Sequence, residues 1–251
     1  MKKIIPLLLL VLAGCSKYDK KYQHVKIDTE YGKIIVKLYN STPNHSKNFI
    51  KLVDEKFYDG IIFHRVIKDF VIQGGDPETK NPKPGVLYGE KDSGYLIDPE
   101  FNDTIIHKKG VIAMARESDD VNPEKRSSGS QFYIVIGKVF TNDQLNQLEQ
   151  KINNERYRVA KENFLAKNQL KGKDQVDSKL DSLKQAVPVF KFSAKQRGVY
   201  TTAGGLPHLD GNYTIFGEVV EGLDVVEKIS LVPTDENDRP KQDIKIKIRQ
   251  I

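Results

Sequence analysis

The side chains best able to take part in chemistry lie together on one short segment, residues 63–76, which reads FHRVIKDFVIQGGD. Arg65 supplies a guanidinium and Gln73 supplies an amide. Alternate side chains of an extended chain share a face, so the segment can place both groups beside large apolar residues such as Phe70 and Val71. A guanidinium is always charged, planar and able to donate several hydrogen bonds. This combination suits stabilisation of a reacting group by a fixed donor, without covalent chemistry.

The sequence lacks the signatures of several other kinds of chemistry. Gly74, Gly75 and Asp76 do not have the spacing of a dinucleotide-binding loop, and residues 128–130 do not form a nucleophile elbow. The 5 histidines show no close metal-ligand pairing. We therefore expect no metal and no cofactor, and neither a hydrolase nor a metalloenzyme.

Two further segments complete a recognisable pattern: residues 129–134 (GSQFYI) and residues 209–217 (LDGNYTIFG). Together with residues 63–76, and in this order, they closely resemble the signature segments of the cyclophilins, a family of peptidyl-prolyl cis-trans isomerases. The resemblance extends over roughly Val25–Ile251 and is interrupted by one insertion. It implies a mainly β fold, namely a closed eight-stranded antiparallel barrel capped by two helices.

The hydrophobic pattern is compatible with this architecture. The predicted strands include residues 25–29, 33–39 and 244–248, and the predicted short helices begin near Pro43 and Gly222. Thr42 is expected to cap the first helix with its hydroxyl, followed by proline in the first turn. Many short strands with two helices fit a closed barrel, because closure leaves no strand edge open.

The resemblance also implies a catalytic mechanism. Rotation about an X–Pro bond breaks amide resonance, against a barrier of about 18–20 kcal/mol. The prolyl nitrogen becomes pyramidal during rotation and gains a lone pair, so a donor aimed at it stabilises the transition state more than either planar state. Arg65 matches the catalytic arginine of the family. Gln73 matches the glutamine that holds this arginine or the substrate backbone.

The substrate-binding positions follow from the same resemblance. A proline ring needs an apolar pocket, and the family's pocket-lining positions are matched by Phe70, Val71, Tyr133 and Leu209. Periodicity alone would make any of these four an ordinary core residue. Further substrate contacts are expected at Ala115, Arg116, Gln131, His208 and Tyr213. The first two match a strand whose backbone grips the substrate.

Several positions depart from the common family pattern. Val71 and Tyr133 replace the commoner methionine and phenylalanine, and Arg116 replaces a frequent asparagine. His208 stands where many members have tryptophan, and Tyr213 where many have histidine. His208 offers less apolar area than tryptophan, which predicts weak binding of cyclosporin. Tyr213 is large enough to form a pocket wall, so we expect activity to survive.

The N-terminus resembles an export and anchoring signal. Two lysines precede an apolar run at residues 4–12, which is too short to span a bilayer. Residues 12–16 (LAGCS) resemble the lipobox of bacterial lipoproteins, in which the cysteine carries the lipid. We expect a signal peptide at residues 1–14, a lipid-modified Cys15 on a tether at residues 15–24, and a location at the bacterial cell envelope, facing the periplasm or the cell surface. The alternative is a cleaved secretion signal with an incidental cysteine.

An insertion of about residues 141–203 interrupts the cyclophilin-like domain at residues 25–251. Leu145, Leu148 and Ile152 share one helical face, and residues 176–187 carry a second apolar stripe, which together predict a helical hairpin. Compact cyclophilins lack this segment. It could be a packing appendage, or it could extend the substrate groove or dock a partner, and both interpretations stay open.

Composition and charge limit the partners. Hydrophobic residues make up 38% of the 251 positions and charged residues 29%, which is typical of a globular protein. The formal charge of +6 is spread without a basic stripe, which argues against nucleic acid. We expect proline-containing polypeptides as partners, contact with a membrane through the lipid anchor, and a monomer. The alternative to an enzyme is a chaperone or scaffold that binds proline segments with little turnover.

Overall fold

The computed structural model describes residues 18–167 and 173–251. Their centre is an eight-stranded antiparallel sheet with the neighbour order β10-β1-β2-β9-β6-β8-β4-β3. Its strands are β1 (His24–Thr29), β2 (Gly32–Leu38), β3 (Phe63–Ile67), β4 (Val71–Gly74), β6 (Val111–Met114), β8 (Phe132–Val135), β9 (Ile215–Glu221) and β10 (Lys247–Gln250). The short strands β5 (Leu96–Ile97) and β7 (Ser127–Ser128) form a separate pair.

The described residues also form five α-helices and two 3-10 turns. They are α1 (Pro43–Asp54), α2 (Asn142–Lys167), α3 (Lys173–Ala186), α4 (Ala194–Thr202) and α5 (Leu223–Ile229), with the 3-10 turns η1 (Pro77–Lys80) and η2 (Pro207–Leu209). Helix α1 packs against β9 and β10, and α5 packs against β2. The Phe49 ring of α1 lies 5.1–5.5 Å from the rings of Tyr58, Phe132 and Phe216, so an aromatic cluster joins this helix to the sheet. These contacts agree with the predicted pair of covering helices.

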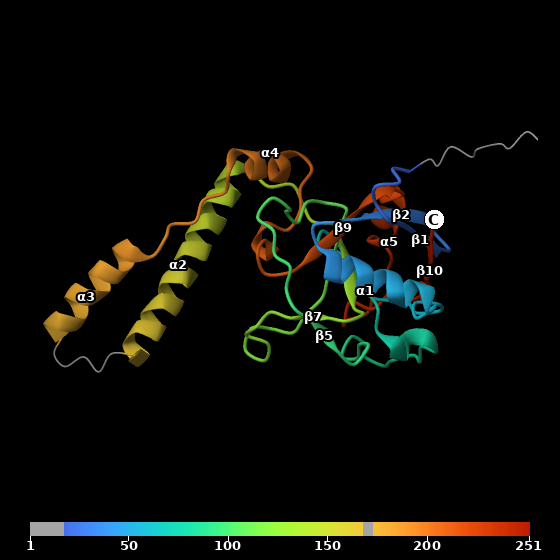
Figure 1. Cartoon of the computed structure of the whole chain (residues 1–251), viewed down its shortest axis with the longest axis horizontal. Coiled ribbons are helices and arrows are strands. Elements are labelled where there is room, and N and C mark those ends of the chain that lie inside the picture. Colours follow the sequence, from blue (N-terminus) through green and yellow to red (C-terminus); the bar gives the residue numbers. More distant parts are fainter. Residues whose placement is uncertain (1–17, 168–172) are drawn as a thin grey trace, which may run out of the picture.

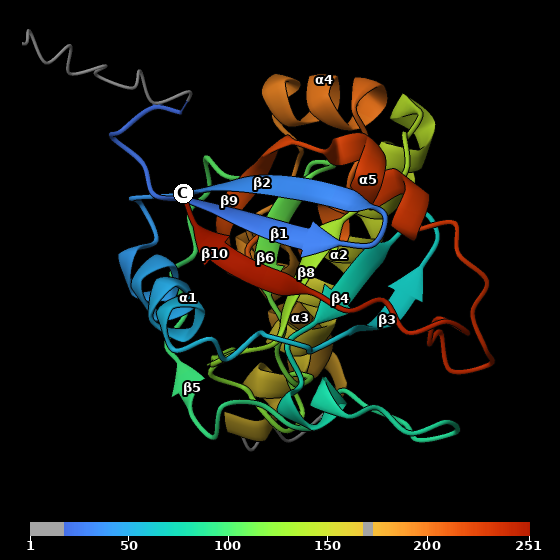
Figure 2. The same ribbon diagram turned by 90° about the vertical axis from the view of Figure 1, so that its right-hand side faces the viewer.

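The sheet curves strongly but does not close as a ladder of strands (Figure 2). Within the described residues, the edge strands β3 and β10 do not pair with each other. The chain just before each strand is joined instead by an isolated bridge between Ile62 and Lys245 and by backbone hydrogen bonds of 2.8–3.1 Å between residues 60–63 and 244–246. The predicted closed barrel is therefore wrong, and the sheet is an open half-barrel. This stretch begins at Gly60, whose φ of 81° belongs to a turn and not to a strand.

Helix α1 begins at Pro43, as predicted, but the Thr42 hydroxyl does not cap it. Among the described residues, this buried hydroxyl has no hydrogen-bond partner. The Glu100 carboxylate, from a distant loop, instead accepts from the backbone N–H groups of Asn44 and His45, both at 3.0 Å. Negative charge is favourable at a helix N-terminus. Burial alone would raise the pKa of Glu100, but its hydrogen bonds hold that pKa below its usual range.

The inserted segment forms an arm that projects from the sheet (Figure 1). Helices α2 and α3 lie side by side as the predicted hairpin, and α4, which the apolar pattern did not predict, lies at the base of the arm. Leu145, Phe192 and Tyr200 are buried there against Ile106. The arm is therefore joined to the sheet by a small hydrophobic core of its own.

The predicted signal peptide and Cys15 lie outside the described residues. The end of the predicted tether packs on the domain: the Tyr18 ring stacks on His24 with 5.1 Å between ring centres, and its hydroxyl donates to Glu221 at 3.1 Å. His24 already belongs to β1. In the part of the chain that the structure covers, no helix combines the length and the apolar character needed to cross a bilayer.

Candidate functional site

The guanidinium and the amide of the segment at residues 63–76 lie side by side. Strands β3 and β4 pair with Arg65 opposite Gln73 and Ile67 opposite Val71, so the pairs that alternation predicted to share a face meet across the two strands. The turn between them contains Asp69 with φ of 58°, a left-handed conformation for which aspartate is enriched. It returns the chain so that the Phe70 ring centre lies 5.9 Å from the guanidinium carbon of Arg65.

A cavity of about 170 Å³ opens beside these two strands. We call it the proline pocket, after its predicted ligand. All the predicted catalytic and substrate-binding residues except Gln131 and His208 line it: Arg65, Phe70, Val71, Gln73, Ala115, Arg116, Tyr133, Leu209 and Tyr213. Its apolar members belong to a hydrophobic cluster that is distinct from the main core. The pocket therefore combines apolar side chains with the guanidiniums of Arg65 and Arg116 and the Gln73 amide in its wall.

A chain of hydrogen bonds orients the two polar groups. Nη1 of Arg65 donates to Oε1 of Gln73 at 3.4 Å, and Nε2 of Gln73 donates to Oε1 of Gln131 at 2.9 Å. Nε2 of Gln131 donates in turn to the carbonyls of Gly89 and Lys91, at 2.7 and 2.9 Å. Because carbonyls can only accept, they fix which end of each amide faces the next group. Gln131 is thus a buried support behind the pocket, and the two carbonyls, being main-chain groups, left no signal in the sequence.

A second contact restrains Arg65 from the solvent side. Its Nε lies 3.7 Å from a carboxylate oxygen of Asp238, and the two side chains are 42% and 45% exposed. An exposed pair of this kind contributes little free energy. It limits the directions open to the guanidinium while leaving it accessible from the pocket. Sequence reasoning did not find Asp238, which lies far away along the chain.

Tyr133 forms a wall of the pocket and is supported from behind. Its hydroxyl lies 3.1 Å from Nε2 of His107, whose Nδ1 lies 3.0 Å from the Asp210 carboxylate. Since the carboxylate accepts, Nδ1 donates to it, and in that tautomer Nε2 accepts from Tyr133. The other carboxylate oxygen accepts from the hydroxyl of Tyr200, on α4, at 2.6 Å. Burial raises the pKa of Tyr133 well above its usual value, so this hydroxyl stays protonated as a donor.

A model of the family described as cyclophilin type peptidyl-prolyl cis-trans isomerase/CLD matches residues 24–172 and 195–250. This chain belongs to that family. The predicted family and enzyme class are thereby confirmed. The gap in the match, at residues 173–194, falls within the predicted insertion.

Curated relatives of the chain occur in fungi and bacteria. Peptidyl-prolyl cis-trans isomerase-like 2 of Rhizopus delemar is 32% identical over 92% of this chain, and a putative bifunctional phosphatase/peptidyl-prolyl cis-trans isomerase of Streptococcus pyogenes is 29% identical over 90%. The chain spans only 29% and 38% of the length of these two proteins. It spans 95% of peptidyl-prolyl cis-trans isomerase ppi1 of Schizosaccharomyces pombe, at 29% identity over 89% of this chain.

The fold is also similar to that of a solved family member. A cyclophilin type peptidyl-prolyl cis-trans isomerase of Cryptosporidium parvum, crystallised in the presence of the dipeptide Ala-Pro, superposes with a TM-score of 0.55 at 25% identity. The match covers 90% of this chain and 98% of that one. The open sheet described above is thus a cyclophilin-like sheet with an added helical arm.

Arg116, one of the departures from the common cyclophilin pattern, contributes its side chain to the pocket. Its guanidinium carbon lies 4.6 Å from the Tyr213 ring centre, and its Nε donates to the carbonyl of Asn212 at 2.7 Å. We had expected mainly backbone contacts here. The N–H of Ala115 already donates to the carbonyl of Gln131 at 2.8 Å, so this group is used within the protein.

His208 does not line the proline pocket. Its ring lies nearly parallel to that of Phe70, at 11° and 6.1 Å between ring centres, on the outer side of the pocket wall. There it borders two wider grooves. Burial and the neighbouring His107 lower the pKa of His208. The histidine thus covers Phe70 rather than the space where the ligand is expected.

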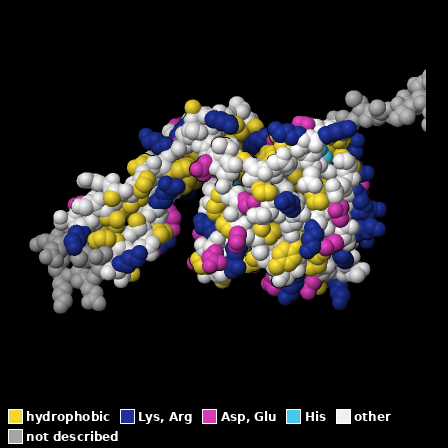
Figure 3. Space-filling view, in the orientation of Figure 1, with side chains coloured by type: hydrophobic (Ala, Val, Ile, Leu, Met, Phe, Trp, Pro, Cys, Tyr) yellow, Lys and Arg dark blue, Asp and Glu magenta, His cyan; other side chains and the backbone are white. Residues whose placement is uncertain are grey.

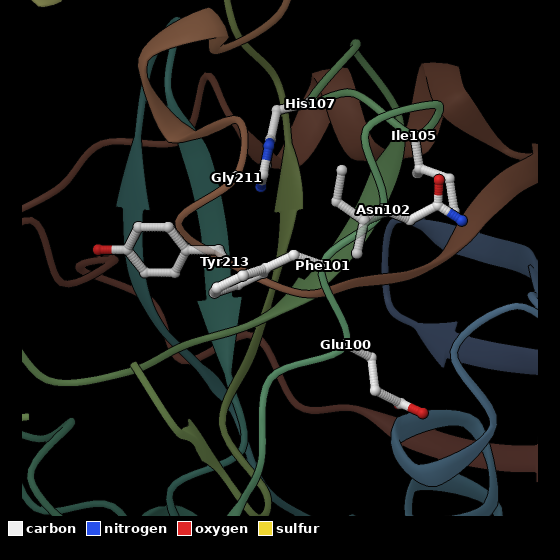
Figure 4. Close-up of a pocket in the computed structure, with 8 residues that line it drawn as sticks. Glu100, Phe101, Asn102, Ile105, His107, Gly211 and Tyr213 are labelled. Carbon is white, nitrogen blue, oxygen red and sulfur yellow. The ribbon is translucent and has the colours of Figure 1, made fainter. Parts of the chain in front are cut away.

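A smaller hollow lies behind Tyr213, between this residue, His107 and the loop at residues 100–105 (Figure 4). Its volume is about 10 Å³, close to the minimum for a single water molecule. It is therefore not a ligand site. Among the described residues, no cluster of histidine, cysteine and acidic side chains could hold a metal ion.

Proposed function

We propose that the proline pocket seats the ring of a prolyl residue and that Arg65 donates a hydrogen bond to the prolyl nitrogen while the X–Pro bond rotates. The position of the Arg65 guanidinium at the wall of an apolar cavity is the main support. The size of the cavity, about 170 Å³, is suitable because an apolar cavity of about 150 Å³ accommodates benzene, which is larger than the proline ring.

The proposed catalysis depends on a donor that is oriented before substrate binds. Gln73 accepts from Arg65, and buried Gln131 fixes the direction of the Gln73 amide. The guanidinium therefore needs little rearrangement when the prolyl nitrogen becomes pyramidal and gains its lone pair. Rotation about the X–Pro bond neither makes nor breaks a covalent bond, so these residues can act without a covalent intermediate.

The decisive experiment is exchange NMR on an X–Pro peptide with the wild type and an Arg65→Ala variant. Loss of one preorganised donor should lower kcat/KM about 10²- to 10³-fold. Arg126→Ala is a matched control, because Arg126 is exposed, pairs with Glu124 at 2.9 Å and lies outside the pocket. Equal exchange rates for the wild type and Arg65→Ala would remove the proposed role of Arg65.

A second candidate function is the binding of proline-containing segments without rapid turnover. It is favoured by the two wide grooves that border His208 beside the pocket. In this case Arg65→Ala would lose isomerisation but still suppress aggregation of an unfolded client protein. If suppression and isomerisation disappear together, binding has no separate role.

We also propose that the chain is a lipoprotein held at a bacterial cell envelope by Cys15, where it acts on exported polypeptides. The sequence LAGCS is the main support. The described chain begins beside β1 and β2, on the side of the sheet opposite the helical arm, so an anchor near residue 15 would leave the pocket facing away from the membrane (Figure 1). Metabolic labelling with palmitate should mark the wild type but not Cys15→Ser. Labelling of both, or of neither, would contradict the anchor.

A further inference from the structure

A second and wider hollow lies next to the proline pocket, between the sheet and the helical arm. Its volume is about 1010 Å³, at the upper end of the range for ligand sites. One wall is a face of α2 between residues 151 and 163, with Phe190 beside it, and the other is the chain at residues 207–213. We call it the arm groove. The space-filling view shows the notch between arm and sheet and the apolar side chains along the arm (Figure 3).

The arm groove is continuous with the proline pocket. Arg116, Leu209 and Tyr213 line both. A polypeptide whose proline occupies the pocket therefore has its neighbouring residues at the mouth of the groove. An extended chain advances about 3.3 Å per residue, so only a few residues beyond the proline are needed to reach along α2.

The face of α2 that lines the groove is only partly buried by packing inside the protein. Leu145 and Leu148 belong to the small core at the base of the arm. Further along the same helix, Ile152 packs against this core and also lines the groove, and Val159 lines the groove with 42% of its surface exposed. Residues at this spacing share one face of a helix. The apolar stripe thus continues from the packed base to the exposed Val159, beside the Phe190 ring, which also packs against that base.

The charges on the groove are unequal. Its acidic residues are already engaged: Asp119 pairs with Arg116 at 2.7 Å, Glu155 pairs at 2.6 Å with an arginine one turn further along α2, and the Asp210 carboxylate accepts from His107 and Tyr200. Lys151 and Arg156 have no carboxylate partner within the part of the chain that the structure describes. Two uncompensated cations therefore flank the apolar stripe, which favours an acidic occupant.

We propose that the arm groove extends the substrate site and binds the residues that flank the proline, with an apolar side chain against the α2 stripe and carboxylates beside Lys151 and Arg156. The proposal rests on the proposed function of the pocket. It assigns a substrate class to this chain: unfolded or exposed polypeptides in which apolar and acidic residues flank an X–Pro bond.

The experiment compares the isomerisation kinetics of three kinds of peptide. One is a short X–Pro peptide with alanine on both sides, and the others extend it, before or after the proline, with leucine and glutamate or with leucine and lysine. The test variant is Lys151→Glu combined with Arg156→Glu. Lys195→Glu is the matched control, because Lys195 is an exposed lysine of the arm that lines neither the pocket nor the groove.

The double variant should raise KM for at least one glutamate peptide about three- to tenfold, given that exposed pairs contribute about 0.2–1 kcal/mol each. The same variant should lower KM for the lysine peptide and leave the short peptide unchanged. High salt should reduce these differences, because it screens exposed charges. Circular dichroism and thermal unfolding establish that both variants are folded.

Two results would overturn the proposal while leaving the pocket intact. One is an unchanged KM for every extended peptide in the double variant, and the other is an equal change in Lys195→Glu, which would indicate net charge alone. Failure of the wild type to isomerise even the short peptide would instead overturn the proposed function of the pocket, and this inference with it.

Discussion

The proline pocket and the arm groove share three residues but are built in opposite ways. In the pocket, each polar group is held by another: Gln131, which is 5% exposed, orients Gln73, which contacts Arg65. In the groove, Lys151 and Arg156 stand on an open helix face without a carboxylate partner in the described chain. Fixed donors suit the stabilisation of a transition state, whereas loosely held charges suit discrimination among substrates. We therefore expect rate and substrate preference to be carried by different parts of the molecule.

Exchanging arginine and lysine in both directions would give the strongest test of this separation between the pocket, which sets the rate, and the groove, which sets the preference. Arg65→Lys keeps the charge but loses the planar fork, so kcat/KM should fall by about 10²-fold, near the loss in an alanine variant. Lys151→Arg, in the groove, should leave the short peptide unaffected. Exchange NMR measures both. Full activity in Arg65→Lys would show that charge alone suffices in the pocket.

The enclosed region beside Arg65 should also make stability depend on pH. His64, next to Arg65 on β3, is 3% exposed, and within the described residues neither of its ring nitrogens has a hydrogen-bond partner. Burial lowers its pKa to about 4. Between pH 6.5 and 4 the unfolded state therefore binds more protons than the folded state, and stability should fall with falling pH by roughly 3 kcal/mol.

Urea unfolding of the wild type and of His64→Phe at several pH values separates this contribution from those of other groups. The difference in stability between the two proteins should change by roughly 3 kcal/mol between pH 6.5 and 4 and should stay constant above pH 6.5. Parallel curves for the two proteins would contradict the assignment to His64.

The hydrogen-bonded support behind the pocket should contribute an intermediate effect. Gln131→Leu removes the acceptor of Gln73 and leaves the carbonyls of Gly89 and Lys91 without their donor. A broken buried hydrogen bond costs about 1–3 kcal/mol, so we expect a loss of stability in this range and a fall in kcat of about tenfold. Gln150→Leu serves as control, because Gln150 is an exposed residue of α2 that lines neither the pocket nor the grooves. An unchanged kcat would mean that the orientation of Arg65 does not depend on this chain of hydrogen bonds.

The smallest effect should come from the exposed stripe of the groove. Val159→Ser should change the free energy of unfolding by less than about 0.5 kcal/mol, as at other open surface positions. Leu145→Ala, in the packed base of the same helix, should cost about 2–5 kcal/mol. Urea unfolding checks both. A large loss in Val159→Ser would show that the stripe packs against the protein and is not an open groove.

Local sequence patterns were sufficient to predict part of the fold and part of the site. Alternation in residues 63–76 predicted that Arg65 shares a face with Ile67 and Gln73 with Val71, because the period of a strand depends only on adjacent residues. The turn at residues 68–69 then sets Arg65 opposite Gln73. The order of three short segments identified the family, and their residues converge on one pocket. The hairpin of the arm was also predictable, since helical apolar spacing is local.

Other features depended on residues far apart in the chain. Glu100, and not Thr42, serves the start of α1, because a carboxylate from another loop reaches the exposed N–H groups. The sheet stays open because only a short stretch before β3 meets the chain before β10. Neither contact has a signal in nearby sequence.

The sequence by itself determined which chemical groups are present and which neighbours along a strand share a face. Only the tertiary structure decided that Tyr200 of the arm supports Asp210 and His107 behind the pocket, and that α2 forms a groove beside it. The physical reason is that such contacts join buried polar groups across long chain distances. They form where the packing of whole elements brings an unsatisfied donor to an acceptor, a property that no single segment encodes.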